Sequence, residues 1–491
     1  MPFLSINGMA GRFLALGLTL FIFQTHATVR GTALATFDGT NGASAQCYGD
    51  ALTLGVDGNF YGTTSGGGEY GKGTVFRITR GGNLTTLHSF NGTNDGQLPL
   101  GGLTALPDGF LYGTAQSGGA NTNGAFYNGT FFKVSTNGEF TLLSHFATET
   151  GANPTGALIQ GNDGHLYGTT FRGGANNLGT VFRVNTNGDF AVVASFSGTN
   201  GANPTGPLLQ TADGEFYGTT AYGGIGFGVV GGGSGSGYGT VFRIATNGVL
   251  TNLVLFNGTN GSNPYSGLIK AGDGHFYGTS AYGGTGFVAG QIKSGHGTIF
   301  RIETDTLTHV PILFPDANTG RSYFGLLQAT DGNLYGVKGG PVSSGEVFRL
   351  SENNEYRSMF RFSSASYVTN GITRYLLGLN PYARLIQTAD GYIWGTTGAN
   401  GMLPNGSNGQ GTVFRLTFPP QLQAIGKTND TTYFSWSGFT GFRYQIQGST
   451  NLAEQSWQNI GDSFIGTNGL NHVSEATEGI AQKFYRILIL E

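Results

Sequence analysis

Thr205-Gly-Pro-Leu-Leu-Gln-Thr-Ala-Asp-Gly-Glu-Phe-Tyr-Gly-Thr-Thr220 is the stretch that decides the fold, because close copies of it occur seven times along the chain. After a glycine-rich loop it continues as Gly239-Thr-Val-Phe-Arg-Ile-Ala-Thr-Asn-Gly248. A repeat period of roughly 50–60 residues is typical of propeller arrays rather than of helical solenoids. The Asp-Gly step of the copies falls at Asp57, Asp108, Asp163, Asp213, Asp273, Asp331 and Asp390.

Apolar residues alternate with period two inside each copy, which predicts β-strands. In the third copy four strands are expected, over residues 156–160, 165–170, 179–184 and 190–196. The Asp-Gly step joins the first two strands and an Asn-Gly step joins the last two, since both dipeptides favour the positive φ of two-residue hairpin turns. Four antiparallel strands repeated seven times predict an all-β, seven-bladed β-propeller.

The two ends of the repeat array complement each other. The last copy stops at Pro419-Pro420 without a fourth strand, whereas Leu34-Ala-Thr-Phe37 reads as a lone fourth strand near the start. If this N-terminal strand completes the last blade, the ring closes and two exposed sheet edges disappear. The sequence therefore predicts a closed ring rather than an open solenoid.

Three segments are expected: a signal peptide over residues 1–27, the propeller over 28–418 and a fibronectin type III-like β-sandwich over 421–491. The first has a basic residue before an apolar run that is too short for a membrane span, then a small-residue cleavage site. The last has short alternating runs without the repeat. Since no later stretch is long and apolar enough to span a membrane, we expect a protein that is secreted, periplasmic or on the cell surface.

The chain has 491 residues, 89 glycines and a net charge of -3, and only 10% of its residues are charged, against about 25% in ordinary globular proteins. This near-neutral composition carries no electrostatic footprint for nucleic acid, which is not an expected partner. The one cysteine, Cys47, excludes a disulfide within the chain.

The motifs Asp-Gly-x-Phe/Leu-Tyr-Gly-Thr-Thr, Gly-Thr-Val-Phe-Arg and Thr-Asn-Gly recur over about residues 34–418. In this combination they resemble the GloVer (Gloeo/Verruco) tandem repeat, which implies an exported bacterial protein. Two copies depart from the pattern. The sixth reads Tyr335-Gly-Val-Lys338 and Gly345-Glu-Val-Phe-Arg349, and the seventh has Trp394 in place of the tyrosine.

One position of the third strand is basic in every copy: Arg77, Lys133, Arg183, Arg243, Arg301, Arg349 and Arg415. A cationic ring of this kind suits sulfate, phosphate or uronate groups. Recurrence in every repeat is instead what a structural role between blades predicts, since a binding site usually breaks the symmetry of a repeat array. We therefore interpret these residues as a structural repeat ring.

Residues that break the repeat are better candidates for ligand contacts. The connections after the second and fourth strands are long and uneven and fall on one face, where binding usually resides. Tyr222 and Tyr282 occupy matching Ala-Tyr-Gly-Gly loops there, and an aromatic platform suits the apolar face of a sugar, although both could simply cap the core. The candidate ligand residues are Tyr222, Tyr282, Phe171, Arg172, Phe227, Phe287 and Lys293.

We expect a non-catalytic exported binding or surface-interaction protein, whose loop-rich face meets extracellular polysaccharide or a surface protein. One alternative is a glycoside hydrolase or polysaccharide lyase with its site over the channel, using loop carboxylates such as Glu69, Glu149 or Asp316. Another is a structural envelope protein. No catalytic residue, metal or cofactor is predicted, because the GxGxxG match at residues 226–231 precedes no helix and the HExxH motif is absent.

Overall fold

The chain divides into two compact units, one over residues 29–418 and one that includes residues 419–491. The computed structural model describes residues 29–45, 52–119, 128–229, 235–314, 321–340, 343–364, 366–369, 372–403, 407–418, 421–428, 431–438, 443–450, 456–466, 469–476 and 484–490. The predicted signal peptide, Cys47 and Pro419-Pro420 lie outside these ranges. Within them, no helix has the length and apolar character needed to cross a membrane.

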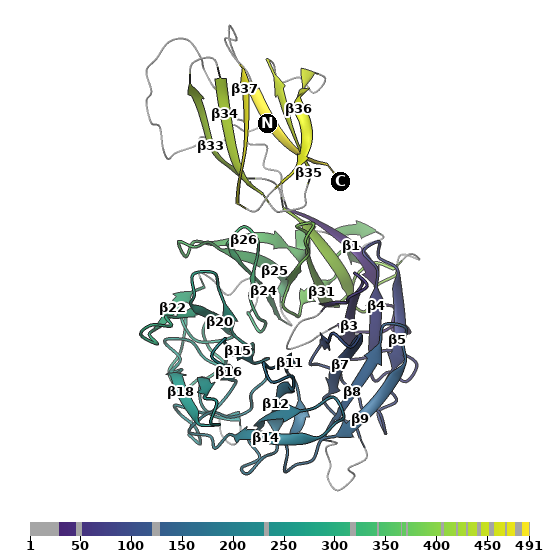
Figure 1. Ribbon diagram of the computed structural model, residues 1–491, viewed down its shortest axis with the longest axis vertical. Helices are drawn as coiled ribbons and strands as arrows, with labels where there is room; N and C mark the ends of the chain where they lie inside the picture. The colour runs from purple at the N-terminus through teal and green to yellow at the C-terminus, as the bar shows by residue number, and fades with distance from the viewer. Residues whose placement is uncertain are drawn as a thin grey trace. The chain divides into compact units, whose positions relative to one another are not determined.

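Seven antiparallel sheets form the blades of a ring in the 29–418 unit (Figure 1). The innermost strands are β2 (Thr53–Leu54), β6 (Leu103–Ala105), β11 (Ile159–Gln160), β15 (Leu209–Gln210), β19 (Ile269–Lys270), β23 (Leu327–Gln328) and β30 (Ile386–Gln387). The second strands are β3 (Phe60–Thr64), β7 (Phe110–Ala115), β12 (Leu166–Arg172), β16 (Phe216–Thr220), β20 (Phe276–Ser280), β24 (Leu334–Gly340) and β31 (Ile393–Ala399).

The third strands of the blades are β4 (Thr74–Ile78), β8 (Thr130–Ser135), β13 (Thr180–Val184), β17 (Thr240–Ile244), β21 (Thr298–Ile302), β25 (Ser343–Leu350) and β32 (Thr412–Thr417). The outermost strands are β5 (Leu84–Ser89), β9 (Phe140–His145), β14 (Phe190–Ser195), β18 (Leu250–Leu255), β22 (His309–Leu313), β26 (Tyr356–Arg361) and β1 (Arg30–Thr36). The predicted seven-bladed β-propeller is confirmed.

The N-terminal strand closes the ring, as predicted. β1 pairs antiparallel with β32, with Arg30 opposite Thr417 and Thr36 opposite Thr412. Blade 7 thus joins strands from the two ends of this unit. Blades 3 and 7 also carry a short additional strand on the second strand, β10 (Ala152–Pro154) and β29 (Leu379–Pro381). Between blades 6 and 7 lie a 3-10 turn, η2 (Phe362–Ser364), and a hairpin, β27 (Ser366–Thr369) and β28 (Ile372–Tyr375).

The outermost strands are protected against pairing with other chains. In blades 1, 2, 3, 4 and 6 the register between the third and fourth strands shifts at the residue before the motif phenylalanine, for example between Val75 and Phe76. Such bulges twist an edge strand away from further partners. In blade 5 the fourth strand pairs without a shift and carries Pro311 opposite Phe300, and a proline removes the donor that an added strand needs.

The core lies between neighbouring blades. Phe196 of blade 3, for instance, packs with Phe242 of blade 4 at 5.1 Å between ring centroids. Side-chain hydrogen bonds also join neighbouring blades. The amide oxygen of Gln328 accepts a hydrogen bond from the backbone N–H of Gly272 at 2.7 Å, and that of Gln387 accepts one from the backbone N–H of Thr330 at 2.7 Å. These contacts hold the innermost strands of blades 6 and 7 against the preceding blade.

The loops fall on two faces. The connections of the Asp-Gly and Asn-Gly type are tight turns on one face. The longer connections, after the second and the fourth strands, lie on the other face, where short bridges join them, such as Ala202 with Tyr222 and Ser262 with Tyr282. We call this second side the loop face.

Backbones of neighbouring blades approach closely at the start of the innermost strands. A Cβ on Gly156 would lie 2.6 Å from the carbonyl oxygen of Gly206, and one on Gly206 would collide with the backbone nitrogen of Gly267. Glycine therefore permits an approach that no other residue allows. Gly156 and Gly206 come just before the innermost strands of their blades, and they lie against the backbone of the next blade instead of pairing within their own sheet.

We predict that Gly206→Ala lowers the free energy of unfolding by about 1–3 kcal/mol, because the added methyl group must push backbone aside. Chemical denaturation measures the effect. Gly81→Ala is the matched control, since the nearest atom to its new Cβ would be 3.9 Å away. Equal stability of the two variants would contradict the close packing of blades 4 and 5.

The C-terminal unit contains two three-stranded antiparallel sheets. One has the order β33 (Gln421–Thr428), β34 (Thr431–Gly438) and β37 (Gly469–Ala476), and the other has β36 (Gln458–Ile465), β35 (Arg443–Ser449) and β38 (Phe484–Leu490). The buried Trp436 of the first sheet contacts Tyr444 and Phe464 of the second, with ring centroids 6.1 and 5.6 Å apart. The two sheets thus face each other around an aromatic core.

Candidate ligand-binding site

A tyrosine, an aspartate and an arginine meet on the tight-turn side of most blades. In blade 1 the hydroxyl of Tyr61 donates to Oδ2 of Asp57 at 2.7 Å, and Arg77 lies across the strand pair from Tyr61. Burial and the bond to Asp57 raise the pKa of Tyr61, so its hydroxyl stays protonated and donates. The same bond occurs as Tyr112–Asp108, Tyr167–Asp163, Tyr277–Asp273 and Tyr335–Asp331.

The basic residues of the third strands are engaged within their own blades. Arg301 pairs with Glu303 at 2.7 Å, and the guanidinium of Arg415 lies 4.1 Å over the ring of Tyr392. Arg243 likewise pairs with Glu215, and Lys133 lies over Phe110. All seven lie across the strand pair from the second-strand aromatic residue: Arg77, Lys133, Arg183, Arg243, Arg301, Arg349 and Arg415. This geometry favours a structural role over a ligand ring.

Two tyrosines break the repeat in the long loops of blades 4 and 5. The hydroxyl of Tyr222 lies 2.9 Å from the hydroxyl of Tyr265, and their rings are nearly perpendicular with centroids 6.2 Å apart. Tyr282 and Tyr323 repeat the arrangement at 3.1 Å and 6.2 Å. Each pair joins the loop after the second strand of one blade to the loop that leads into the next blade.

The partner tyrosines share one position in consecutive repeats. Tyr265 and Tyr323 each precede the turn aspartate of their blade by eight residues, as Tyr382 does in blade 7. The rings of Tyr265 and Tyr323 lie 5.5 Å apart, and Tyr382 contacts Phe324 at 5.5 Å. All three come just before an innermost strand, at the inner end of the loop face. We call Tyr222, Tyr265, Tyr282, Tyr323 and Tyr382 the tyrosine cluster.

The cluster is a set of hydrogen-bond donors. Burial raises the pKa of Tyr265, Tyr323 and Tyr382, and the bond to Tyr282 adds to the effect at Tyr323. The hydroxyls therefore stay protonated at neutral pH. Within the described ranges the hydroxyl of Tyr382 has no hydrogen-bond partner, because blade 6 carries Gly340 where blades 4 and 5 carry a tyrosine.

The sequence pattern of the blades identifies the family. The Gloeobacter/Verrucomicrobia repeat matches residues 19–128, 122–306 and 226–378. The chain belongs to this repeat family. The predicted resemblance is confirmed for the propeller, and the likeness of residues 421–491 to a fibronectin type III module remains a prediction. No curated protein matches the chain.

Several solved structures are similar to this member of the Gloeobacter/Verrucomicrobia repeat family. PorZ, a surface component of the type-IX secretion system of Porphyromonas gingivalis, is 12% identical with a TM-score of 0.47 over 91% of this chain and 57% of its own. A periplasmic gluconolactonase of Pseudomonas aeruginosa is 14% identical, with a TM-score of 0.43 over 92% and 100%. An ulvan lyase is 11% identical, with a TM-score of 0.43 over 78% and 95%. Similarities of this size carry no inference about activity.

The remaining candidate residues have different surroundings. Phe227 and Phe287 fill the spaces beside Gly198 and Gly258 that any Cβ there would need, and both pack on core clusters that Tyr222 also touches. Their rings therefore hold loops together. Phe171 and Arg172 are half-buried in blade 3, while Lys293 is exposed on the long loop of blade 5.

Tyr282 is buried, with 9% of its surface exposed, so its ring offers no open platform for a sugar. It supports Tyr323 from behind instead. Reasoning from single residues missed Tyr265, Tyr323 and Tyr382. The signal that finds them is their common distance from the Asp-Gly turn, at a position where blades 2, 3 and 4 carry Leu100, Thr155 and Thr205.

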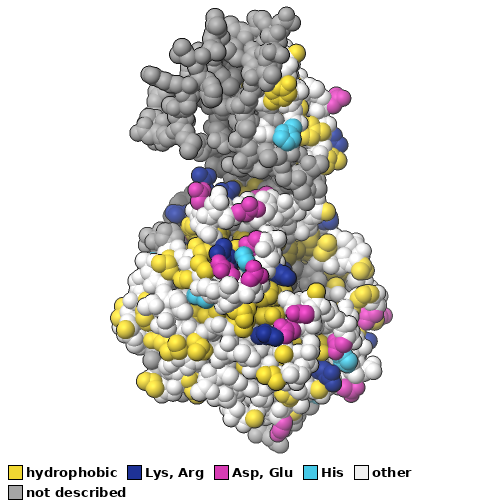
Figure 2. Space-filling model, turned by 60° about the vertical axis from the view of Figure 1, so that its left-hand side comes forward, with side chains coloured by type: hydrophobic (Ala, Val, Ile, Leu, Met, Phe, Trp, Pro, Cys, Tyr) yellow, Lys and Arg dark blue, Asp and Glu magenta, His cyan; other side chains and the backbone are white. Residues whose placement is uncertain are grey.

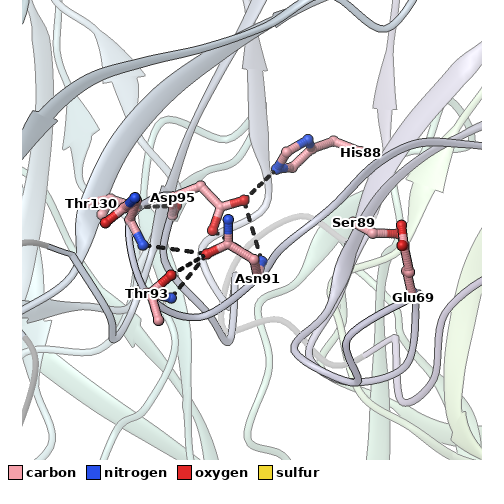
Figure 3. Close-up of polar contacts among 8 residues, drawn as sticks. Glu69, His88, Ser89, Asn91, Thr93, Asp95 and Thr130 are labelled. Atoms are coloured by element: carbon pink, nitrogen blue, oxygen red, sulfur yellow. Dashed lines mark hydrogen bonds and ion pairs between the residues drawn. The ribbon is translucent and has the colours of Figure 1, made fainter.

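A second polar network organises the loop that leads into blade 2 (Figure 3). Oδ2 of Asp95 lies 2.9 Å from Nε2 of His88, and the same carboxylate accepts the backbone N–H of Asn91 at 3.0 Å. The ring of His88 stacks on Phe140 at 3.7 Å, and Thr130 donates to the carbonyl of Asp95 at 2.8 Å. These bonds tie the loop to the neighbouring strands, which indicates a structural role.

Charged side chains are sparse on the face of the molecule drawn in Figure 2, where they lie singly or in small groups among uncharged surface. Among the residues that the structure describes, no group of three or more His, Cys, Asp or Glu side chains converges as metal ligands. The tyrosine cluster remains the candidate ligand-binding site, because it lies on the loop face and departs from the sevenfold repeat.

Proposed function

We propose that this protein is exported and binds extracellular polysaccharide without catalysis, through the tyrosine cluster on the loop face of its propeller. One observation carries the proposal: two tyrosine pairs join blades 4, 5 and 6, and a further tyrosine, Tyr382, follows at the same position before blade 7, so these residues break the sevenfold repeat. Contacts that the repeat itself requires recur in every blade, whereas a binding site needs only one sector of the ring. Surfaces formed by loops on a rigid scaffold are where propellers present binding residues.

The chemistry of the cluster suits a sugar chain. Aromatic rings contact the C–H faces of sugar rings, and phenol hydroxyls donate hydrogen bonds to sugar oxygens. Tyr323 and Tyr382 are half-buried, so part of each ring reaches solvent. The hydroxyl of Tyr382 is available to a ligand, while the hydroxyl–hydroxyl bond to Tyr282 holds Tyr323 in place. A preformed site of this kind avoids the entropy cost of ordering side chains on binding.

The enzyme alternative draws on the same place, since tyrosine and arginine converge there. A tyrosine that acts as a general base must lose its phenol proton readily, which requires a lowered pKa. Burial has the opposite effect here, because it raises the pKa of Tyr265, Tyr323 and Tyr382. The carboxylates that a hydrolase would need are dispersed: Glu69 and Glu149 are exposed on separate loops, and Asp316 lies outside the described residues. Binding without turnover is therefore the better supported function.

The C-terminal unit is proposed to be a fibronectin type III-like module that acts as a spacer or attachment domain. Its strand orders, β33-β34-β37 and β36-β35-β38, support this proposal because they place two antiparallel sheets around a central tryptophan.

We predict that Tyr382→Ala weakens binding of a retained polysaccharide at least about tenfold, as expected for a central aromatic contact. The mature protein, residues 28–491, is incubated with a panel of soluble and insoluble polysaccharides, and retained protein and released reducing or unsaturated ends are measured in the same tubes. Tyr70→Ala is the matched control, because Tyr70 is 52% exposed on a loop of blade 1.

Retention without released ends, lost in Tyr382→Ala and kept in Tyr70→Ala, is the expected result. Released ends would favour the enzyme alternative. Absence of both signals across the panel would favour a structural envelope protein, and equal retention by the two variants would move the binding site away from the cluster.

A further inference from the structure

Arg321 lies at the edge of the tyrosine cluster, on the loop that leads into blade 6. Its guanidinium carbon is 4.6 Å from the centroid of the Tyr282 ring. Its backbone pairs with Gly339 through two hydrogen bonds of 2.8 and 2.9 Å. Since the hydroxyl of Tyr282 is bonded to Tyr323, the guanidinium and the two phenols form one contiguous group. The backbone hydrogen bonds to Gly339 and the contact with the Tyr282 ring hold the guanidinium of Arg321 in place.

Among the described residues no carboxylate forms an ion pair with Arg321, in contrast to Arg243 and Arg301 of the third strands. The Nε of Arg321 is also buried without a hydrogen-bond acceptor. Arg243 and Arg301 share this buried Nε, so the missing carboxylate is what distinguishes Arg321. A ligand with a negative charge would supply the partner that those two arginines find within the protein.

Resting on the proposed function, we infer that the polysaccharide is acidic and that a uronate carboxylate binds the guanidinium of Arg321. The planar fork of arginine donors matches the two oxygens of a carboxylate. Neighbouring sugar rings then contact Tyr323 and Tyr382. Arg384 adds a second cationic side chain nearby, since its Cδ lies 3.2 Å from the place that a Cβ on Gly325 would take, two residues after Tyr323.

The cation is peculiar to this sector of the ring. The loops that lead into blades 3, 4 and 5 carry asparagine at the place of Arg321 relative to the turn, namely Asn153, Asn203 and Asn263. The side-chain amide of each asparagine donates to a backbone carbonyl, and each residue has a positive φ, as is typical of asparagine in turns. Blade 6 replaces the turn former by a cation that faces the cluster.

The test compares polygalacturonate and alginate with the same polymers after reduction of their carboxyl groups, and with dextran sulfate as a sulfated polymer, using the full mature chain. Affinity electrophoresis or calorimetry at low salt gives the dissociation constants. Arg321→Met removes the charge but keeps a stem that can pack on Tyr282, and Arg321→Lys keeps the charge but loses the fork. Lys72→Met is the control, because Lys72 is an exposed cation on the loop after the second strand of blade 1. Circular dichroism melts verify that each variant is folded.

We expect wild type to bind at least one uronate polymer about 10–100-fold more tightly than its reduced form, as charged hydrogen bonds imply. Arg321→Met abolishes this preference, Arg321→Lys retains part of it, and Lys72→Met leaves it unchanged. Equal binding of native and reduced polymers by wild type, or an unchanged preference in Arg321→Met, overturns the inference and leaves the proposed function intact. Tighter binding of dextran sulfate than of either uronate polymer overturns the choice of carboxylate. Binding of none of these, nor of any neutral polymer in the panel, overturns the proposed function itself.

Discussion

Glu346→Gln is expected to lower the free energy of unfolding of the propeller by about 3–5 kcal/mol, because it leaves a buried ammonium without its counter-charge. Lys338 and Glu346 are 0% and 1% exposed and lie 3.9 Å apart, Nζ to Oε1. Tyr356 and Ser358 also donate to the Glu346 carboxylate. Lys338 further lies 4.7 Å over the ring of Phe314. Denaturant titration of both proteins measures the loss.

The pair replaces a smaller contact of other blades. At the same two positions blade 1 has Thr64 and Thr74, whose hydroxyl oxygens are 2.8 Å apart. Lys338→Met combined with Glu346→Gln is therefore expected to recover most of the loss, since neutral residues of similar volume often substitute for a buried ion pair without cost. Glu352→Gln, a change at an exposed glutamate of the same blade, is the control. A single Glu346→Gln variant as stable as this control would show that the pair is not charged.

Lowering the pH from 6.5 to 4 is expected to remove about 3 kcal/mol of stability through His309 alone. Burial lowers the pKa of His309 to about 4 from the ordinary 6.5. The unfolded chain thus binds a proton near pH 6.5 that the folded chain accepts only near pH 4. The free energy of unfolding is therefore unaffected by His309 above pH 6.5, and it falls as the pH is lowered from 6.5 towards 4. The difference of about 2.5 in pKa, at about 1.4 kcal/mol for each unit, gives the stated size.

The surroundings of His309 explain the direction of this shift. Its ring contacts Phe256 and Phe300 at 5.5 and 5.6 Å, and its Nε2 is buried without an acceptor. Blades 1 and 4 carry Leu84 and Leu250 at this position of the fourth strand. His309→Leu should therefore flatten the stability profile between pH 6.5 and 4 relative to wild type. Parallel profiles for the two proteins would contradict the assignment.

Much of the fold follows from local pattern. The predicted strands over residues 165–170 and 190–196 correspond to β12 and β14 within two residues, because alternation and Asp-Gly or Asn-Gly turns are local signals. The first strand, predicted over 156–160, has only residues 159–160. Gly156 runs against the carbonyl of Gly206 in the next blade, and such contacts between repeats leave no trace in the pattern of one repeat.

The candidate site was predictable in part. The symmetry-breaking positions Tyr222 and Tyr282 follow from comparison of the repeats. Their partners, Tyr265 and Tyr323, lie in loops rich in asparagine, glycine and proline. Such residues indicate a turn, so the sequence alone gives no reason to single out the tyrosines among them. The burial of Tyr282 depends on Arg321, which is close in space but comes from the loop of another blade. Contacts of this kind require the assembled ring.

Hydrogen exchange of the mature protein with and without a retained polysaccharide is the most direct test of binding at the tyrosine cluster, because it locates the bound polysaccharide on the molecule. We expect slower exchange in residues 258–268, 321–328 and 379–386, which carry or adjoin the tyrosine cluster. We expect no change in the tight turns of residues 161–165 and 271–275. Protection confined to those turns, or to the C-terminal strands over 443–490, would contradict the account.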